Sequence, residues 1–425
     1  MSRRDSVRAR VLTVLVGVAL ALTLAAPAGA AASIPSQIAS VLAKHGLSGS
    51  GTSVGVYDLT AKRTLYSLRW DVPRLPASNE KLVTSGAALA DWSATHRFST
   101  QLFVDEAAPG ADGVLPGNVY LRGLGDPSLS TPGFQSGHLG IQTSGLGDFV
   151  ARLKALGVTR ISGRVVADDG YFDSLRAVPC WRPGMTAYCG PISALTLNEG
   201  FGPDGGYVSD PALWAAGKLT SLLRAAGIRV TRAPAHGAAP DTATLSYTEK
   251  SAPLGLLLAA MNKPSDDFLA EELFKGLGAS FGGAGTSSAG ATVADKFLKH
   301  IGITSGFRIH DGSGLSYTDK LSAHAVIVLL GAMARRADFT TFWSSLAVAG
   351  VDGTLGDRMK GTRAAGNVHG KTGTLAAASG LSGYVTSAGG HTLLFSILMN
   401  GSGLSQIEAH EAQDSIAELL AASTP

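Results

Sequence analysis

The chain opens and closes with strand and helix patterns, and this arrangement limits its possible folds more than any other feature. Apolar residues recur at helical spacing over 34–46 and again from Ser405 to the end. The expected strands are 53–59, 63–68, 370–375, 381–386 and 392–399. An antiparallel sheet with both terminal helices packed on one face would bring the two ends of the chain together.

The region from about 100 to 245 has a different sequence pattern, in which predicted short strands and Gly/Pro turns alternate with predicted helices. A helical pattern resumes near residue 250. The 425 residues also correspond to two or three domains. We therefore predict an α/β (α+β) fold, in which an antiparallel sheet flanked by helices is interrupted by an inserted mixed α/β region. The expected divisions are 31–100 and 248–425 for the two parts of the main domain and 101–247 for the insertion.

Residues 1–30 have the features of a secretory signal peptide. Four arginines come first, Val11–Leu24 is then almost entirely apolar, and Ala28-Gly29-Ala30 is a cleavage pattern. The apolar run is shorter than the roughly 20 residues that a membrane-spanning helix needs. We expect a secreted protein, in the extracellular or cell-wall/periplasmic space, with no stable membrane span after cleavage. The choice between Sec and twin-arginine export stays open.

Charge argues against a nucleic-acid partner. Four of the 35 basic and one of the 32 acidic residues lie in the first 30 positions, so the remainder carries 31 of each sign. Such a balance does not provide the broad basic surface that nucleic acids require. We expect no nucleic-acid partner.

The chain contains two cysteines, Cys180 and Cys189. In a secreted chain such a pair predicts a disulfide that closes a short loop, with two free thiols as the alternative. No metal site is predicted, because the sequence contains neither Cys-x-x-Cys nor His-Glu-x-x-His.

The first of three short motifs is Ser78-Asn79-Glu80-Lys81, at the start of a predicted helix. A lysine three residues after a serine lies on the same helix face. When buried, it can lose its proton near neutral pH and accept the proton of the serine. The alternative is an N-cap serine with a surface lysine.

The other two motifs are Ser265-Asp266-Asp267, which opens a helix, and Lys371-Thr372-Gly373-Thr374, which starts a strand. Serine and aspartate are favoured at helix starts, so capping alone could explain the second motif. Lysine and two threonines can hold a carboxylate, although an edge strand guarded by lysine would look the same.

Taken together, the three motifs are much more specific than any one of them. Ser-x-x-Lys, Ser-Asp-Asn and Lys-Thr-Gly in this order are typical of penicillin-binding proteins and class A β-lactamases. Ser78 and Ser265 are 187 residues apart, and Ser265 and Lys371 are 106 apart. The first gap is much larger than in a compact β-lactamase, so an inserted domain lies between the motifs.

With this spacing, the chain resembles the class C low-molecular-mass penicillin-binding proteins, the D-alanyl-D-alanine carboxypeptidase/D-Ala-D-Ala endopeptidase family. The resemblance covers nearly the whole mature chain. Further matching segments are Gly123–Pro127, Gly163–Val166, Ala270-Glu271, Asp311–Ser316, Gly353–Leu355 and Leu381–Tyr384.

The resemblance implies a role for each motif residue. Ser78 would be the nucleophile that forms an acyl-enzyme, and Lys81 would be its general base. Ser265 would relay a proton to the leaving D-Ala nitrogen. Lys371 would keep Lys81 deprotonated by like-charge repulsion and help to orient Ser265.

The Lys-Thr-Gly strand would bind the substrate. Thr372 and Thr374 would bind the terminal carboxylate, Gly373 between them would also belong to the substrate-binding residues, and the backbone N–H groups of Ser78 and Thr374 would form the oxyanion hole. The implied partners are peptidoglycan stem peptides that end in D-Ala-D-Ala, with β-lactam antibiotics as acylating inhibitors. No metal or organic cofactor is implied.

Asp267 departs from the family pattern, which has asparagine there. An asparagine can donate to a substrate carbonyl and accept from a lysine at once, whereas an ionised aspartate only accepts. It would also favour the charged form of Lys81. The alternatives are a serine β-lactamase or esterase on the same fold or, because of Asp267, a catalytically impaired peptidoglycan-binding protein. Gly51–Gly55 also matches Gly-x-Ser-x-Gly, but a turn precedes it where that motif needs a strand.

Overall fold

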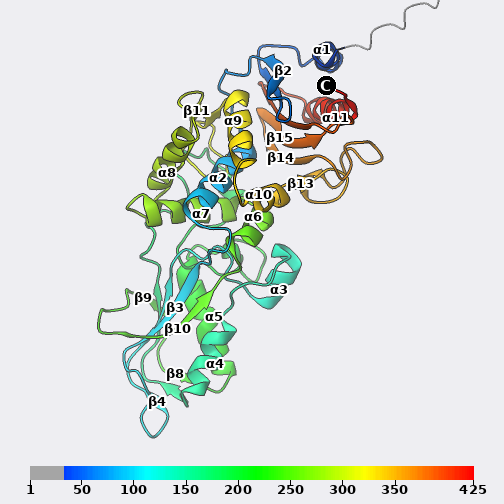
Figure 1. Cartoon of the computed structure of the whole chain (residues 1–425). Helices are drawn as coiled ribbons and strands as arrows, with labels where there is room; N and C mark the ends of the chain where they lie inside the picture. The colour runs from blue at the N-terminus through cyan, green and yellow to red at the C-terminus, as the bar shows by residue number, and fades with distance from the viewer. Residues whose placement is uncertain (1–32) are drawn as a thin grey trace, which may run out of the picture. The chain divides into compact units, whose positions relative to one another are not determined.

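Strands from both ends of the chain form one six-stranded sheet (Figure 1). The structure is a computed structural model that describes residues 33–425, so the predicted signal peptide at 1–30 lies outside the described residues. The strand order is β13-β14-β15-β16-β1-β2, and all neighbours are antiparallel. Their bounds are β1 Thr52–Asp58, β2 Arg63–Leu68, β13 Ala347–Val348, β14 His369–Leu375, β15 Ala378–Thr386 and β16 Thr392–Asn400. The predicted antiparallel sheet is confirmed.

Helices α1 (Ile34–Lys44) and α11 (Gln406–Ala422) pack together on one face of this sheet (Figure 1). Ser405 caps α11 and accepts a hydrogen bond from the Glu408 N–H at 3.3 Å. The Glu408 carboxylate contacts His45 Nδ1 at 2.7 Å. The terminal helices meet over the sheet as expected.

The other face of the sheet meets a group of helices. These are α2 Lys81–Asp91, α6 Leu254–Asn262, α7 Asp267–Phe281, α8 Ser287–His300, α9 Ala323–Met333 and α10 Phe339–Ser345. They share a core with Ala378, Tyr384 and Leu394 of the sheet. The sequence pattern did not indicate α8 and α10. In the described part of the chain, no helix is long and apolar enough to cross a membrane.

The inserted region contains two further sheets. The first has the order β10-β3-β5-β7-β9, and the second is the parallel set β4-β6-β8. The bounds are β3 Ser99–Val104, β4 Val114–Leu115, β5 Val119–Gly123, β6 Arg160–Ile161, β7 Val165–Asp168, β8 Arg229–Val230, β9 Ala235–His236 and β10 Thr244–Lys250. Helices α4 (Gly147–Ala155) and α5 (Pro211–Ala225) complete its core.

The chain enters and leaves the insertion through β3 and β10, which pair with each other. Paired strands at the two crossing points allow a region to be inserted without disturbing its host. This pairing supports the division into 31–100, 101–247 and 248–425, which remains our proposal.

The predicted disulfide between Cys180 and Cys189 is wrong, because both cysteines are free thiols. The Cys180 thiol donates to Ser316 Oγ at 3.4 Å. Cys189 is buried, and its thiol donates to the Gly190 carbonyl at 3.4 Å. Each thiol therefore has an oxygen partner of its own, which proximity in sequence alone does not reveal.

The pairing of the terminal helices with the sheet can be tested with two isoleucines of α11. Ile416 is fully buried and Ile407 is 70% exposed. We expect Ile416→Ala to lower the free energy of unfolding by about 2–5 kcal/mol, because it leaves a cavity in the core. Ile407→Ala is the matched control and should leave stability nearly unchanged. Urea unfolding measures both, and equal losses would contradict the assignment of the buried face.

Candidate active site

Ser78 and Lys81 lie on one turn at the start of a buried helix. Ser78 is in the 3₁₀ turn η1 (Ala77–Glu80), which continues into α2 with Lys81 as its first residue. Lys81 Nζ lies 3.1 Å from Ser78 Oγ. The Lys81 side chain is fully buried, so the alternative of a surface lysine is wrong.

Lys81 has two further partners, both on other segments. Its Nζ donates to Asp267 Oδ1 at 2.5 Å and to the Ser313 carbonyl at 2.8 Å. An ammonium group fits this set with three donated hydrogen bonds. A neutral amine would donate two of these bonds and accept the third from the Ser78 hydroxyl. The geometry therefore suits Lys81 both before and after it accepts a proton.

The second motif combines helix capping with a contact to the site. Asp266 is the N-cap of α7 and accepts from the Leu269 N–H at 2.8 Å. The capping interpretation is thus correct for Asp266, whereas Asp267 contacts Lys81. Burial raises the pKa of Asp267, and the charge of Lys81 opposes this rise. Ser265 has a positive φ of 70°, a costly conformation for a non-glycine residue that is typical of functional sites.

Gly373 brings β14 against the nucleophile segment. A Cβ atom there would lie 2.7 Å from the Pro76 carbonyl oxygen and Asn79 Nδ2, and 3.1 Å from the Ser78 nitrogen. Gly380 on β15 has the same relation to Asn79, at 2.6 Å. Only glycine permits this approach, so Gly373 makes room for the serine segment, which is a different task from the substrate contact expected of it.

Lys371 is fully buried on β14, between β13 and β15, so the interpretation as an edge-strand guard is wrong. Its Nζ donates to the Thr372 carbonyl at 3.1 Å. Burial, and next the positive charge of Lys81, hold the pKa of Lys371 well below its usual value. A neutral Lys371 is the state that such an environment favours.

The two threonines of the third motif have different surroundings. Thr372 is buried, and its Oγ1 donates to Thr354 Oγ1 at 2.7 Å. Thr374 is exposed. Thr354 belongs to a segment that the sequence analysis matched to the family without giving it a role. Thr374 is therefore the threonine of this motif that can reach a ligand in solvent. Thr354 sets the position of Thr372.

The loop at 311–316, which provides the Ser313 carbonyl, had no predicted role in the site. The buried carboxylate of Glu271 accepts from the N–H groups of Gly312 and Ser313 at 3.0 and 2.8 Å. Burial, and next the charge of Asp311, raise the pKa of Glu271 to about 8. The loop matched the family pattern, but a carbonyl contact is made by the backbone and leaves no signal in residue type.

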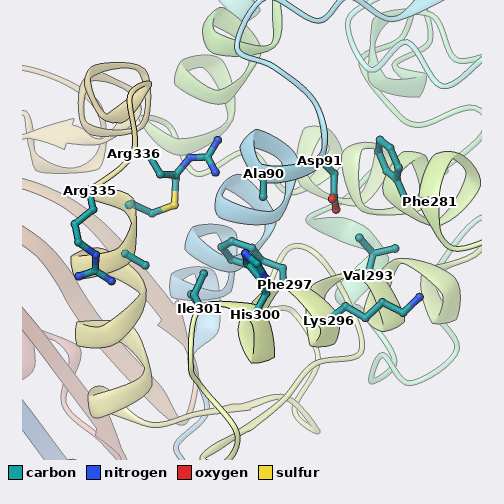
Figure 2. Close-up of a pocket in the computed structure, with 12 residues that line it drawn as sticks. Ala90, Asp91, Phe281, Val293, Lys296, Phe297, His300, Ile301, Arg335 and Arg336 are labelled. Atoms are coloured by element: carbon teal, nitrogen blue, oxygen red, sulfur yellow. The ribbon is translucent and has the colours of Figure 1, made fainter.

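A cavity of about 740 Å³ lies away from these motifs, beside the end of α2 and helices α8 and α9 (Figure 2). Phe297, Met333 and Val293 give it an apolar lining, and Lys296 and Arg335 add positive charge. None of the motif residues lines it. The site of the three motifs is therefore defined by their mutual contacts and not by this cavity.

Comparison with known proteins identifies the family. The model of the D-Ala-D-Ala carboxypeptidase 3 (S13) family matches residues 34–204 and 202–423. The chain belongs to this family. It is 34% identical to a D-alanyl-D-alanine carboxypeptidase of Actinomadura sp. (strain R39), over 91% of this chain and 84% of the relative. It is 29% identical to a carboxypeptidase of Mycobacterium tuberculosis, over 82% of this chain and 76% of that one.

Solved structures show the same fold. Penicillin-binding protein 4 of Haemophilus influenzae matches with a TM-score of 0.75 at 20% identity, over 90% of this chain and 98% of that one. A predatory endopeptidase of Bdellovibrio bacteriovorus matches with a TM-score of 0.55 at 19% identity, over 86% and 90%. The expected class C penicillin-binding family, its fold and its serine-type D-Ala-D-Ala carboxypeptidase class are confirmed.

The lowered pKa of the buried Lys371 leads to a prediction about pH. The unfolded chain binds more protons than the folded one between the lowered pKa and the usual value near 10.5, so wild-type stability rises with pH there. We expect Lys371→Met to stabilise the protein at pH 7 by about 1–3 kcal/mol, the usual cost of a poorly compensated buried polar group.

The difference between wild type and Lys371→Met should shrink as the pH approaches 10.5. Urea unfolding at pH 7 and pH 9.5 measures this change. Lys360→Met, at a lysine that is 59% exposed, is the control and should show little effect at either pH. A variant less stable than wild type at pH 7 would contradict the assigned direction of the pKa.

Proposed function

We propose that this protein is a secreted serine-type D-Ala-D-Ala carboxypeptidase that trims peptidoglycan stem peptides, alone or together with DD-endopeptidase activity. The observation that carries this proposal is the buried contact of Lys81 Nζ with Ser78 Oγ at 3.1 Å. A serine nucleophile needs an adjacent base, and a buried lysine is one of the few groups that can act as that base. Membership of the S13 family and the named carboxypeptidase relatives support the substrate class.

The proposed reaction begins when Ser78 Oγ attacks the carbonyl carbon of the penultimate D-Ala. Lys81 takes the hydroxyl proton, and a bond forms between Oγ and the carbon. The C–N bond to the last D-Ala then breaks, while Ser265 passes its hydroxyl proton to the leaving nitrogen and receives in exchange the proton that Lys81 took from Ser78. Water attacks the carbonyl carbon of the resulting ester and gives a proton to Lys81, the C–Oγ bond breaks, and Lys81 passes that proton to Ser78 Oγ, which restores the serine and releases the shortened peptide.

The third motif would hold the substrate. Thr374, which is exposed, is suited to bind the terminal carboxylate, with Thr372 beside it. The N–H groups of Ser78 and Thr374 would donate to the developing oxyanion. The close approach of β14 to Ser78 at Gly373 supports this arrangement, since it brings both backbone segments to one place.

β-Lactams would acylate the same serine, because their strained amide presents its carbonyl to the same nucleophile. A structurally similar Bdellovibrio endopeptidase is described in a form acylated by penicillin G. The lifetime of such an adduct on this chain would separate a peptidase from a β-lactamase or esterase. Rapid release of the adduct would favour the β-lactamase.

Asp267 supports a second candidate, a protein of the same fold with impaired catalysis. Asp267 contacts Lys81 at 2.5 Å. As a carboxylate it stabilises the ammonium form of Lys81, which cannot accept the serine proton. Both candidates bind peptidoglycan, and they differ in the rate of acylation.

The proposed location is the extracellular or cell-wall/periplasmic space. It depends on the signal peptide expected at residues 1–30, which lie outside the described residues. The D-Ala-D-Ala substrate occurs in the cell wall, which agrees with that location.

Covalent labelling with a fluorescent penicillin tests the nucleophile. We expect one adduct on the purified protein, detected as a single mass increment, and none on Ser78→Ala. Ser93→Ala changes an exposed serine two residues beyond α2 and should be labelled like wild type. A folded wild-type protein that forms no adduct would overturn the active-enzyme proposal in favour of the impaired protein.

Asp267→Asn tests whether the aspartate, which replaces the asparagine of the family pattern, changes the rate of acylation. We expect acylation by penicillin to accelerate by about 10- to 1000-fold, because one donor to the reacting carbonyl is restored. Asp266→Asn removes a charge one residue away and preserves the helix cap, so its effect should be much smaller. Stopped-flow measurement of acylation compares the variants, and a slower Asp267→Asn would show that the carboxylate assists the reaction.

A further inference from the structure

Three potential metal ligands from distant parts of the chain meet beside the second motif. His138 lies in η2 (Gln135–Leu139) and Glu199 in the turn η4 (Asn198–Gly200), both in the insertion, and Asp266 is the cap of α7. His138 Nε2 is 3.1 Å from Glu199 Oε2 and 3.8 Å from Asp266 Oδ2. One ligand atom from each residue lies within 4.8 Å of the other two.

The Glu199 carboxylate is only partly satisfied by the protein. Its side chain is 5% exposed, and among the described residues Oε1 has no hydrogen-bond partner. A buried carboxylate oxygen without a partner is costly unless a cation or a donor reaches it. Oε2 of the same carboxylate contacts His138, so the carboxylate that joins the cluster carries a second oxygen without a partner in the described part of the chain.

The spacing suits a transition-metal ion. Zinc binds imidazole nitrogen and carboxylate oxygen at about 2.0–2.2 Å with tetrahedral geometry, which places the ligand atoms roughly 3.3–3.6 Å apart. The separations of His138 Nε2 from Glu199 Oε2 and from Asp266 Oδ2, 3.1 and 3.8 Å, lie on either side of this range. We propose that His138, Glu199 and Asp266 form a site for a divalent zinc-type cation.

The protein also fixes the histidine ring and leaves one side open. The Phe134 ring packs against that of His138 with a centroid distance of 4.4 Å. The His138 side chain is 44% exposed, whereas those of Glu199 and Asp266 are 5% and 12% exposed. An ion could therefore enter from solvent, bind the two carboxylates and keep a water molecule as its fourth ligand.

An ion here would join the insertion to the catalytic region. Asp266 caps α7 and precedes Asp267, the partner of Lys81. Holding Asp266 would restrict the start of α7, and with it the position of Asp267. This effect on catalysis depends on the proposed function, but binding of the ion does not.

A second cluster, His45, Glu408 and Glu411, provides an internal comparison. Its two glutamates are 46% and 59% exposed, so water already solvates them. Such carboxylates have less need of a cation than Glu199 has. We therefore assign tight binding to the His138 cluster.

Calorimetric titration of the purified protein with Zn²⁺ tests the assignment. We expect one tightly bound ion on wild type. His138→Ala should weaken this binding at least about tenfold, and Asp266→Asn, which keeps the helix cap, should do the same. His45→Ala should bind like wild type. Thermal unfolding of each variant shows that it is folded.

Zinc binding that is equal in wild type and His138→Ala, or lost in His45→Ala, or absent from folded wild type, would overturn the proposal. Penicillin labelling of the same samples separates this result from the proposed function. A protein that binds zinc through His138 but forms no adduct with penicillin would support the proposed metal site and contradict the proposed enzyme activity.

Discussion

The structure around the site depends on a single buried lysine. Lys81 is inaccessible to solvent, and its Nζ contacts Ser78, Asp267 and the Ser313 carbonyl. Burying an ionisable amine costs several kcal/mol unless partners replace the lost water. The three partners come from η1, α7 and the loop at 311–316, so the main-domain segments on either side of the insertion must be in place before this lysine is satisfied. The insertion lies between these segments and can vary without removing a partner.

The sequence predicted the sheet well because its signals are local. Alternation of apolar residues predicted the strand at 53–59, and the segment 63–68, predicted as its hairpin partner, coincides with β2. The motifs were located because chemical type and order are visible in one dimension. The contacts that complete the site are different in kind. Ser313 contributes a backbone carbonyl, and the glycine at 373 acts by lacking a side chain. Neither role depends on a residue type with recognisable chemistry.

Two features of the structure were predicted wrongly or overlooked in the sequence for a related reason. A disulfide was predicted between the two cysteines because they are close in sequence, but each thiol has its own oxygen partner in the fold. The cluster of His138, Glu199 and Asp266 was overlooked because its members are 61 and 67 residues apart in sequence. Proximity along the chain is thus a poor guide to side-chain pairing when an insertion folds back onto its host. Distances in the folded chain are needed to decide such cases.

The residue at position 267 has opposite effects on the stability of the buried lysines and on the reactivity of Lys81. Lys81 and Lys371 are both fully buried, and the charge of Lys81 contributes to the low pKa of Lys371. A carboxylate at 267 offsets this positive charge, so it lowers the electrostatic cost of folding the two lysines together. An asparagine there would leave that charge unbalanced and would favour a neutral Lys81, which is the form that can accept a proton. In the proposed reaction, the aspartate therefore stabilises the resting site through the same interaction that disfavours the neutral amine needed to accept the serine proton.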